Sequence, residues 1–230
     1  PTFYTPSSDR AALEPARRAA SGKQLRPGEP IRLLFVGGLS TAKGADRVVS
    51  IYQQAVQRLA QTHPDTRIDL DLVGDGPLRA ELETRAEAFC PSASDEASPG
   101  HRIVLHGWQP REVVARHFAR AHIVLLPSRS EGWPKVLSEA MAHGAVPLAS
   151  DVSGVAATLG DARTGTTFAS GDVDGFANAV VAYATNADRW RRESEHAVCA
   201  AAAFGFDAYL DAVRRLFADS FGLDLPQDRA

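Results

Sequence analysis

The sequence has little cysteine, no block of basic residues and no long apolar run. Its 230 residues include only two cysteines, Cys90 and Cys199, which is typical of reduced proteins rather than of disulfide scaffolds. No apolar stretch approaches the ~18 residues that a membrane-spanning helix needs. The N-terminal letters PTFYTPSSDR are neither basic nor apolar, so they do not indicate a signal peptide. The net charge of -3 argues against a nucleic-acid partner. We therefore expect a cytoplasmic protein with no transmembrane segment, whose parent is at most peripheral at the inner face of a membrane.

Local signatures of metal and dinucleotide binding are also missing. The seven histidines and two cysteines form no His-x3-His pair and no Cys-x2-Cys pair, and His117 and His122 fall in different expected elements. We therefore expect no metal site. The glycine loop 37–44 (GGLSTAKG) is not a Walker A loop, because Lys43 precedes Gly44. It does not meet the Gly-x-Gly-x-x-Gly fingerprint either, which disfavours a nicotinamide oxidoreductase.

The composition is that of an ordinary globular chain, with 44% hydrophobic and 23% charged residues. Short apolar runs alternate with segments of helical periodicity, which predicts βαβ units. Strands are expected at 31–36, 68–73, 103–105, 123–126, 145–149 and 165–168, and helices at 43–59, 78–89, 111–120 and 134–143, with further helices from 173 onward. The predicted fold class is α/β, with a single Rossmann-like, doubly wound parallel sheet.

Two glycine-rich turns follow expected strands. In the loop 37–44, Gly37 and Gly38 would let the backbone approach a ligand, and the N–H groups at the start of the next helix could hold a diphosphate. An ordinary strand–helix turn explains this loop equally well. The second turn, 74–77 (GDGP), is a weaker signal, because Asp-Gly turns are common for conformational reasons alone.

The segment 127–150 (PSRSEGWPKVLSEAMAHGAVPLAS) is more informative. Glu131 and Glu139 are separated by seven residues, and Pro134 suits the first turn of a helix. Glu131 would then lie in the loop and Glu139 about one and a half turns into the helix. Two carboxylates placed in this way can contact different parts of an elongated polar ligand. The alternative is a pair of solvated side chains.

The order and spacing of these loops resemble the retaining GT-B glycosyltransferases commonly called family 4, or group 1. The resemblance runs from Leu33 to about Ala184. It rests on LFVGGL with the following Lys-Gly pair, on LVGDGPLR, on VLHGW at 104–108, on the segment 128–144 and on Gly165. It implies that the chain is the C-terminal, nucleotide-sugar-binding half of an enzyme with two Rossmann-like halves.

The resemblance also assigns roles to single residues. Glu139 resembles the carboxylate that accepts hydrogen bonds from the ribose, and Glu131 resembles the carboxylate near the donor sugar. Lys43 resembles the lysine that neutralises the diphosphate, so Glu131 and Lys43 are the candidate catalytic residues. The donor-binding candidates are Gly37, Gly38, Lys43, Gly76, Trp108, Ser128, Gly132, Trp133 and Glu139.

One departure from the family pattern concerns positive charge. Gly38 stands where the family commonly has Arg, so a second cation on the diphosphate is missing. Arg129 or Lys135 could replace it, although Lys135 follows a proline and could point to solvent. Trp133 replaces a more usual Phe.

We expect three segments. Residues 1–30 would be an inter-domain connector, residues 31–205 the nucleotide-sugar-binding domain, and residues 206–230 a C-terminal helix that packs on a missing N-terminal domain. The chain begins at Pro1 rather than Met, which suggests a processed or cut-out piece.

The resemblance implies retaining transfer of a sugar from a nucleotide diphosphate sugar to an acceptor hydroxyl, without a metal or another cofactor. The base, the sugar and the acceptor stay open. The fragment alone is expected to be inactive. The alternative function is a non-catalytic module that binds sugar nucleotides.

Overall fold

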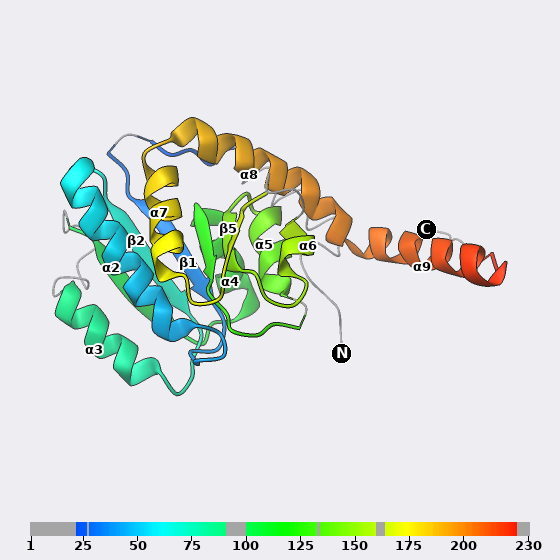
Figure 1. Cartoon of the computed structure of the whole chain (residues 1–230), viewed down its shortest axis with the longest axis horizontal. Coiled ribbons are helices and arrows are strands. Elements are labelled where there is room, and N and C mark those ends of the chain that lie inside the picture. Colours follow the sequence, from blue (N-terminus) through cyan, green and yellow to red (C-terminus); the bar gives the residue numbers. More distant parts are fainter. Residues whose placement is uncertain (1–21, 27, 91–99, 133, 160–163, 225–230) are drawn as a thin grey trace.

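A six-stranded parallel sheet forms the centre of the chain (Figure 1). The computed structural model describes residues 22–26, 28–90, 100–132, 134–159 and 164–224. The strands are β1 (Ile31–Val36), β2 (Ile68–Val73), β3 (Arg102–Gly107), β4 (Ile123–Leu126), β5 (Val146–Ser150) and β6 (Thr166–Phe168). Their order is β3-β2-β1-β4-β5-β6, and every neighbouring pair is parallel. This order confirms the predicted doubly wound α/β fold.

Helices cover both faces of the sheet. They are α2 (Ala45–Thr62), α3 (Arg79–Phe89), α4 (Arg111–Arg120), α5 (Lys135–Ala142), α6 (Val155–Leu159), α7 (Val173–Ala184), α8 (Ala187–Ala201) and α9 (Phe206–Phe221), with a 3-10 turn at Ala202–Phe204. Each predicted strand and helix is present, with ends shifted by a few residues. The sequence analysis missed α6, because a five-residue helix is too short to show periodicity.

Burial on both faces explains the continuous apolar strands. In β1, Leu33 and Phe35 belong to the core cluster formed with α2 and α7, whereas Leu34 packs on the opposite face with Phe118 of α4 and Ala140 of α5. Successive side chains of a strand point to opposite faces. Successive positions 33–35 of β1 are therefore all apolar, rather than alternate ones only.

The direction of the strand order changes between β1 and β4. From β1 the chain proceeds through α2 to β2 and β3 on one side, and β4, β5 and β6 follow on the other side. The loops that leave the carboxyl ends of β1 and β4 therefore diverge, and this divergence opens a crevice where ligands bind in such sheets. Residues 37–44 and 127–134 are these two loops. The fold thus brings together the two segments that the sequence singled out.

The segment before β1 packs on the domain where the structure describes it. Lys23 Nζ donates to the carbonyl oxygens of Phe118, Ala121 and His143 at 3.1, 2.6 and 2.8 Å. These carbonyls lie at the C-terminal ends of α4 and α5, where a cation is favoured. Burial lowers the pKa of Lys23 to about 7, whereas three carbonyl acceptors favour the ammonium form. This lysine ties the expected connector to two helix ends.

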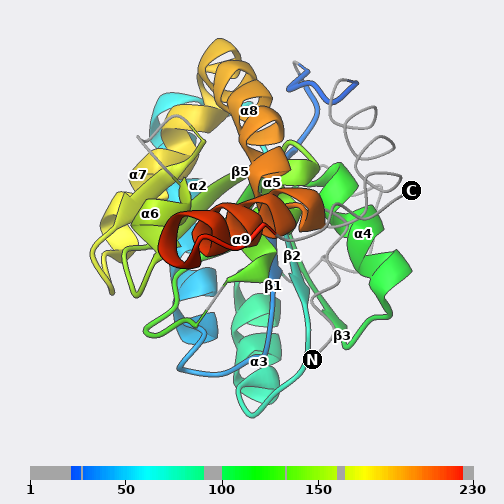
Figure 2. The ribbon, with the colours of Figure 1, turned by 90° about the vertical axis from the view of Figure 1, so that its right-hand side faces the viewer.

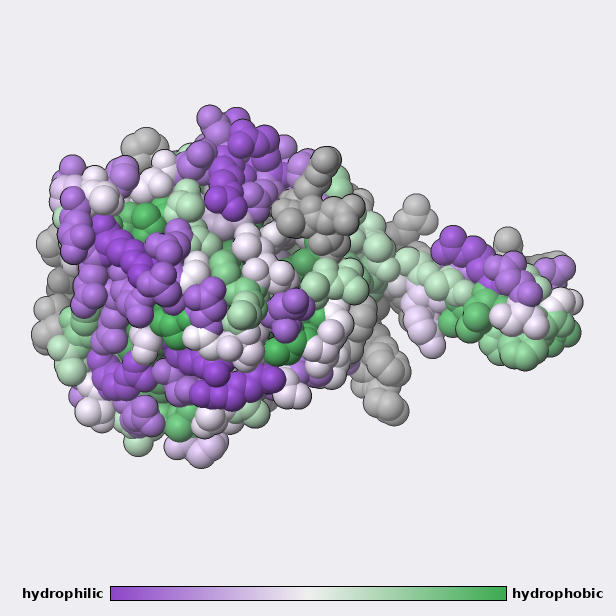
Figure 3. Space-filling model, in the orientation of Figure 1, coloured by the Kyte–Doolittle hydropathy of each residue, from purple (hydrophilic) through white to green (hydrophobic). Residues whose placement is uncertain are grey.

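The helix α9 projects from the body of the domain (Figures 1 and 2). Its exposed large apolar side chains are Tyr209, Leu216 and Phe221, and Leu223 follows the helix. The space-filling view shows apolar residues gathered on one side of this helix and polar residues on the other (Figure 3). The C-terminal helix therefore presents an apolar surface. Its packing on another domain stays a prediction.

No helix within the described ranges combines the length and the hydropathy that a bilayer crossing requires.

Candidate functional site

The loops after β1 and β4 are clasped together. Arg129 donates its backbone N–H to the carbonyl of Ala42 at 2.9 Å, and Ser128 Oγ lies 3.4 Å from the Lys43 carbonyl oxygen. From the other side, Arg47 Nη1 donates to the Pro127 carbonyl at 3.2 Å. These contacts cross the switch point of the sheet. They hold the two loops as one unit at its carboxyl edge.

Glu131 and Lys43, the two candidate catalytic residues, are in direct contact. Lys43 Nζ donates to Glu131 Oε2 at 2.7 Å, and Ser128 Oγ donates to Glu131 Oε1 at 2.6 Å. The Glu131 side chain is only 4% exposed, whereas that of Lys43 is 41% exposed. Both carboxylate oxygens are therefore engaged. The ammonium keeps further donor capacity, because it has three N–H groups and its side chain is partly exposed.

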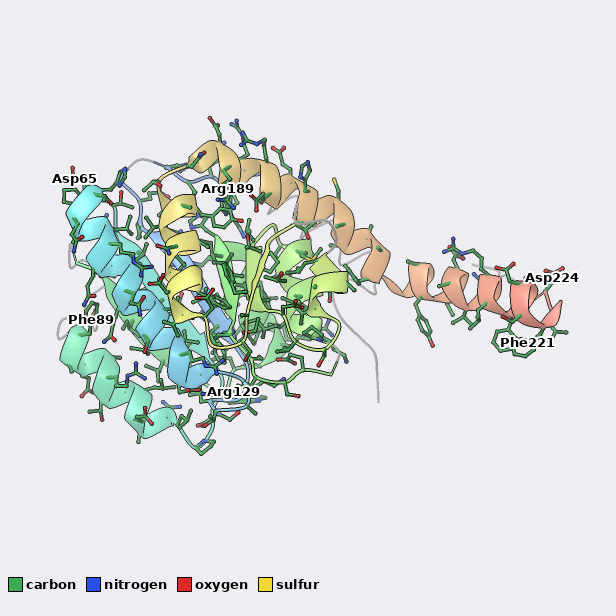
Figure 4. The ribbon with its side chains drawn as sticks, viewed as in Figure 1. Asp65, Phe89, Arg129, Arg189, Phe221 and Asp224 are labelled. Carbon is green, nitrogen blue, oxygen red and sulfur yellow. The ribbon has the colours of Figure 1, made fainter. Side chains whose placement is uncertain are left out.

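Arg129 does not stand free to replace the missing arginine. Its Nη1 and Nη2 each donate to a carboxylate oxygen of Asp46 at 2.8 Å, and Nη1 also donates to the Thr41 carbonyl. The hydrogen bond from Arg129 lowers the pKa of Asp46. Arg129 lies beside the N-terminal end of α2 (Figure 4). Its charge is thus already balanced by Asp46, and its visible role is to brace the first glycine loop.

Gly44 is required by both conformation and space. Its φ is +69°, in the left-handed region, and a Cβ there would lie 1.9 Å from the Pro127 carbonyl oxygen. No other residue type fits without moving the loop after β4. Gly44 therefore fixes the approach of the two loops.

The second turn, 74–77, packs closely against the first glycine loop. A Cβ on Gly74 would lie 1.9 Å from the Gly37 carbonyl oxygen, and one on Gly76 would lie 2.6 Å from the Leu39 carbonyl oxygen. The Leu39 N–H donates to Asp75 O at 2.9 Å, and Gly37 N–H donates to Val73 O at 3.0 Å. Gly76 is thus needed for close packing between two loops. Its contact with a ligand stays a prediction.

Gly38 and Gly132 differ from these tightly packed glycines. A Cβ on Gly38 would have only the Asp75 carbonyl oxygen near it, at 4.0 Å, and one on Gly132 would meet nothing within 4 Å. Gly132 is exposed in the loop after β4. The space at Gly38 accommodates a side chain, so packing does not explain the missing arginine.

Glu139 is half-buried in α5 and has no visible donor. Among the described residues, none donates a hydrogen bond to its carboxylate. Burial raises the pKa of Glu139, and the charges of Arg111 and Lys135 partly offset this effect. A half-buried carboxylate without donors is expensive in the folded chain, and such groups gather at functional sites. Lys135 thus acts electrostatically near Glu139.

The aromatic candidates are placed differently. Trp108 follows β3 and is 73% exposed, so its ring is accessible at the carboxyl edge of the sheet. Trp133 lies outside the described residues. Ligand contact stays a prediction for each of the donor candidates.

Two further residues join this region without having been identified from the sequence. Ser153 Oγ donates to the Glu131 carbonyl at 2.5 Å, and Ser153 has a φ of 56°, which is uncommon for a residue other than glycine. Arg111, the first residue of α4, contributes positive charge near Glu139. A serine in a turn and an arginine after a proline carry no distinctive sequence signal. Only the fold brings them to this edge.

The chain is similar to known transferases. It matches the family described as glycosyl transferases group 1 over residues 30–186. It is 32% identical over 203 residues to a D-inositol 3-phosphate glycosyltransferase of Nocardia farcinica, with 87% of this chain and 43% of the relative covered. It is 30% identical over 222 residues to one of Mycobacterium marinum, with 93% and 45% covered. The chain spans about half the length of the curated relatives it matches.

Solved structures share the fold. HepE of Anabaena in complex with UDP superposes with a TM-score of 0.66 at 16% identity, covering 92% of this chain and 54% of that protein. WaaG, a glycosyltransferase involved in lipopolysaccharide biosynthesis, superposes with a TM-score of 0.64 at 21% identity, covering 93% and 55%. At these identities the likeness supports the architecture and not a particular substrate.

Proposed function

Because the chain belongs to the glycosyl transferases group 1 family, we propose that it is the donor-binding half of a glycosyltransferase. The full protein would transfer a sugar from a nucleotide diphosphate sugar to an acceptor hydroxyl, with retention at the anomeric carbon and in the manner of family 4. This chain would be its C-terminal domain. Neither a metal nor a second cofactor takes part in the proposed transfer.

The observation that carries the proposal is the carboxylate of Glu139. It is half-buried in α5, has no donor among the described residues, and has a raised pKa because of its burial. A ribose offers two neighbouring hydroxyl donors that would satisfy it. Charge-assisted hydrogen bonds of this kind are stronger than neutral ones. The free chain thus bears a cost that a bound nucleoside would relieve.

The leaving diphosphate would be stabilised by fixed positive groups. Lys43 has N–H donors beyond the one that Glu131 accepts, which would bind the diphosphate, and backbone N–H groups of the loops 37–44 and 127–134 would add to it. Glu131 would position Lys43 and stand near the donor sugar. Ser153 and Ser128 would in turn hold Glu131. The catalytic contribution of this half is therefore electrostatic and geometric.

The acceptor would be held by another part of the full protein. The chain spans about half of its curated relatives, and α9 presents an apolar side that nothing covers within the described residues. Transfer requires donor and acceptor at near-attack distance. We propose that an N-terminal domain of the same protein packs on α9 and completes the cleft, and that the protein works in the cytoplasm, at most peripherally at the inner membrane face.

A second candidate is a binding module without catalysis. Two observations favour it: Gly38 supplies no cation, and both oxygens of Glu131 are already hydrogen-bonded. The two functions share the donor site and differ in the reaction of the full-length protein.

Binding and turnover are tested separately. Calorimetry with UDP, GDP and ADP should show one nucleotide bound per chain, and UDP is the first choice because a structural relative holds it. Incubation of the chain with sugar nucleotides and simple acceptors should give no sustained transfer, although slow donor hydrolysis is compatible with an open site. Absence of binding to every nucleoside diphosphate would remove the donor-site assignment. Sustained transfer by the 230 residues alone would instead refute the half-enzyme proposal.

Full-length protein separates the two candidates. Glycoside product from a donor and an acceptor supports the transferase. Tight donor binding without product across a broad acceptor panel supports the binding module.

A further inference from the structure

Three potential metal ligands converge on the sheet face that α4 covers. They are Asp71 of β2, His106 of β3 and His117 of α4, and one ligand atom from each lies within 4.8 Å of the others. His106 Nε2 is 2.6 Å from Asp71 Oδ1, and His117 Nδ1 is 4.0 Å from Asp71 Oδ2. The two imidazole rings are 4.4 Å apart between centroids. The three side chains are 14–25% exposed, so they lie at the surface of the core and are reachable by ions.

The fold places these residues on rigid elements. Asp71 pairs with Val104 in the β2–β3 register, and His106 is the residue that the register skips between Leu105 and Gly107. The contact of His106 with Asp71 shows that both side chains lie on the same face of the sheet. The helix α4 crosses this face between β3 and β4 and carries His117 in its last turn. The three ligands lie on two strands and on the helix that covers them, so no loop residue is needed to complete the ligand set.

Their chemistry is that of a zinc-type site. Two imidazoles and one carboxylate, with a fourth position left for water, are a recurrent ligand set for such ions. Bonds of about 2.0–2.2 Å in tetrahedral geometry place ligand atoms roughly 3.4 Å apart. The contacts of 2.6 and 4.0 Å lie on either side of that value. Binding an ion would therefore lengthen the His106–Asp71 contact and shorten the His117–Asp71 contact.

We propose that Asp71, His106 and His117 bind one divalent transition-metal ion of the zinc type, which fastens α4 to the sheet. None of the three ligands is among the residues proposed to hold a sugar donor, and the proposal does not depend on the proposed transfer. It assigns the ion a structural role at the corner between β3 and α4. That corner carries Trp108, two residues beyond His106.

Two of the ligands have shifted pKa values, and a bound ion must displace any proton that His106 carries. Burial, followed by the neighbouring charge of His106, lowers the pKa of His117, and the neutral imidazole is the form that ligates metals. Burial opposes ionisation of Asp71, but the hydrogen bond and charge of His106, with the charges of Arg102 and His117, hold the pKa of Asp71 below its usual range.

Nearby guanidinium groups act against a cation. Arg116 and Arg120 lie close enough to lower the pKa of His117. Arg102 is paired with Asp69 at 3.8 Å, which offsets part of its charge. The balance favours an ion that forms strong bonds to imidazole over Mg²⁺ or Ca²⁺, which prefer oxygen ligands.

The test uses chelator-treated, untagged chain titrated with Co²⁺ and then with Zn²⁺. We expect one Co²⁺ per chain with the intense visible absorption of tetrahedral coordination, displaced by Zn²⁺. Zn²⁺ should also raise the melting temperature. The variants Asp71→Asn, His106→Gln and His117→Gln should each lose stoichiometric binding. The exposed histidines supply matched controls, and His63→Gln and His196→Gln should bind as the wild type does.

A second measurement uses only the wild-type chain, so it tests the proposal even if a variant fails to fold. Zn²⁺ should protect His106 and His117 from carbethoxylation while His63 and His196 stay reactive. The proposal is overturned if the wild type gives no tetrahedral Co²⁺ spectrum, if cluster and control variants bind alike, or if Zn²⁺ protects neither cluster histidine.

Discussion

Replacing Glu139 by Gln should have opposite effects on ligand binding and on the stability of the free chain. The substitution keeps the shape of the side chain and removes its negative charge. A hydrogen bond to a charged group contributes about 1.5–3 kcal/mol. Nucleotide affinity should therefore fall by roughly 10- to 150-fold, since about 1.4 kcal/mol corresponds to a factor of ten.

The stability effect follows from the raised pKa of Glu139. Because its pKa is higher in the folded chain than in the unfolded chain, the native state binds the proton more tightly. The unfolding free energy then decreases as the pH rises through the glutamate range. At neutral pH the ionised carboxylate destabilises the free chain, with Arg111 and Lys135 offsetting part of the cost. Glu139→Gln should therefore melt at a higher temperature than the wild type at pH 7, and this gain should shrink below about pH 4.

Two measurements check these effects together. Calorimetry with the best-bound nucleoside diphosphate gives the affinity of each variant, and thermal unfolding without ligand at pH 7 and near pH 4 gives the stability. Glu195→Gln, an exposed change on α8, should alter neither quantity. Equal affinities of Glu139→Gln and wild type would refute the ribose assignment. A lower melting temperature of the variant at pH 7 would refute the electrostatic argument.

The remaining predictions concern charge and the uncovered helix. Lys43→Ala should weaken the binding of a nucleoside diphosphate far more than the binding of the nucleoside, as measured by calorimetry. Equal losses of affinity would mean that the lysine has a structural role. The melting temperature should also fall, because Glu131 loses its partner. Gly38→Arg should tighten diphosphate binding about tenfold or more through one charged hydrogen bond, whereas the neutral Gly38→Gln should not, and an unchanged affinity in both would exclude a phosphate near this position. The uncovered apolar side of α9 should make the isolated chain self-associate, so Leu216→Ser with Phe221→Ser should reduce self-association in sedimentation velocity without lowering the melting temperature, since both side chains are exposed. A monomeric wild-type chain would contradict this expectation.

Within the structure, the accuracy of the strand predictions has a simple cause. A parallel strand with helices on both faces is largely apolar, as in residues 33–36 of β1 and in all of β4, and short apolar runs separated by helical periodicity leave few alternatives. The order of the glycine turns and the Glu131/Glu139 segment likewise pointed to the family before any contact was known. The helix α6 escaped notice because five residues do not complete two turns.

The sequence by itself determined the doubly wound α/β class, the family and the loops that form the crevice, because these depend on local periodicity and on spacing along the chain. Only the tertiary structure decided which side chains contact one another. Arg129 pairs with Asp46 across 83 positions, and Lys43 with Glu131 across 88. The cluster of Asp71, His106 and His117 likewise joins three elements, and the spacing of the histidines along the chain did not predict it. Strand order and the direction of each side chain bring such residues within a few ångströms, and neither can be derived from the distance between them in the chain.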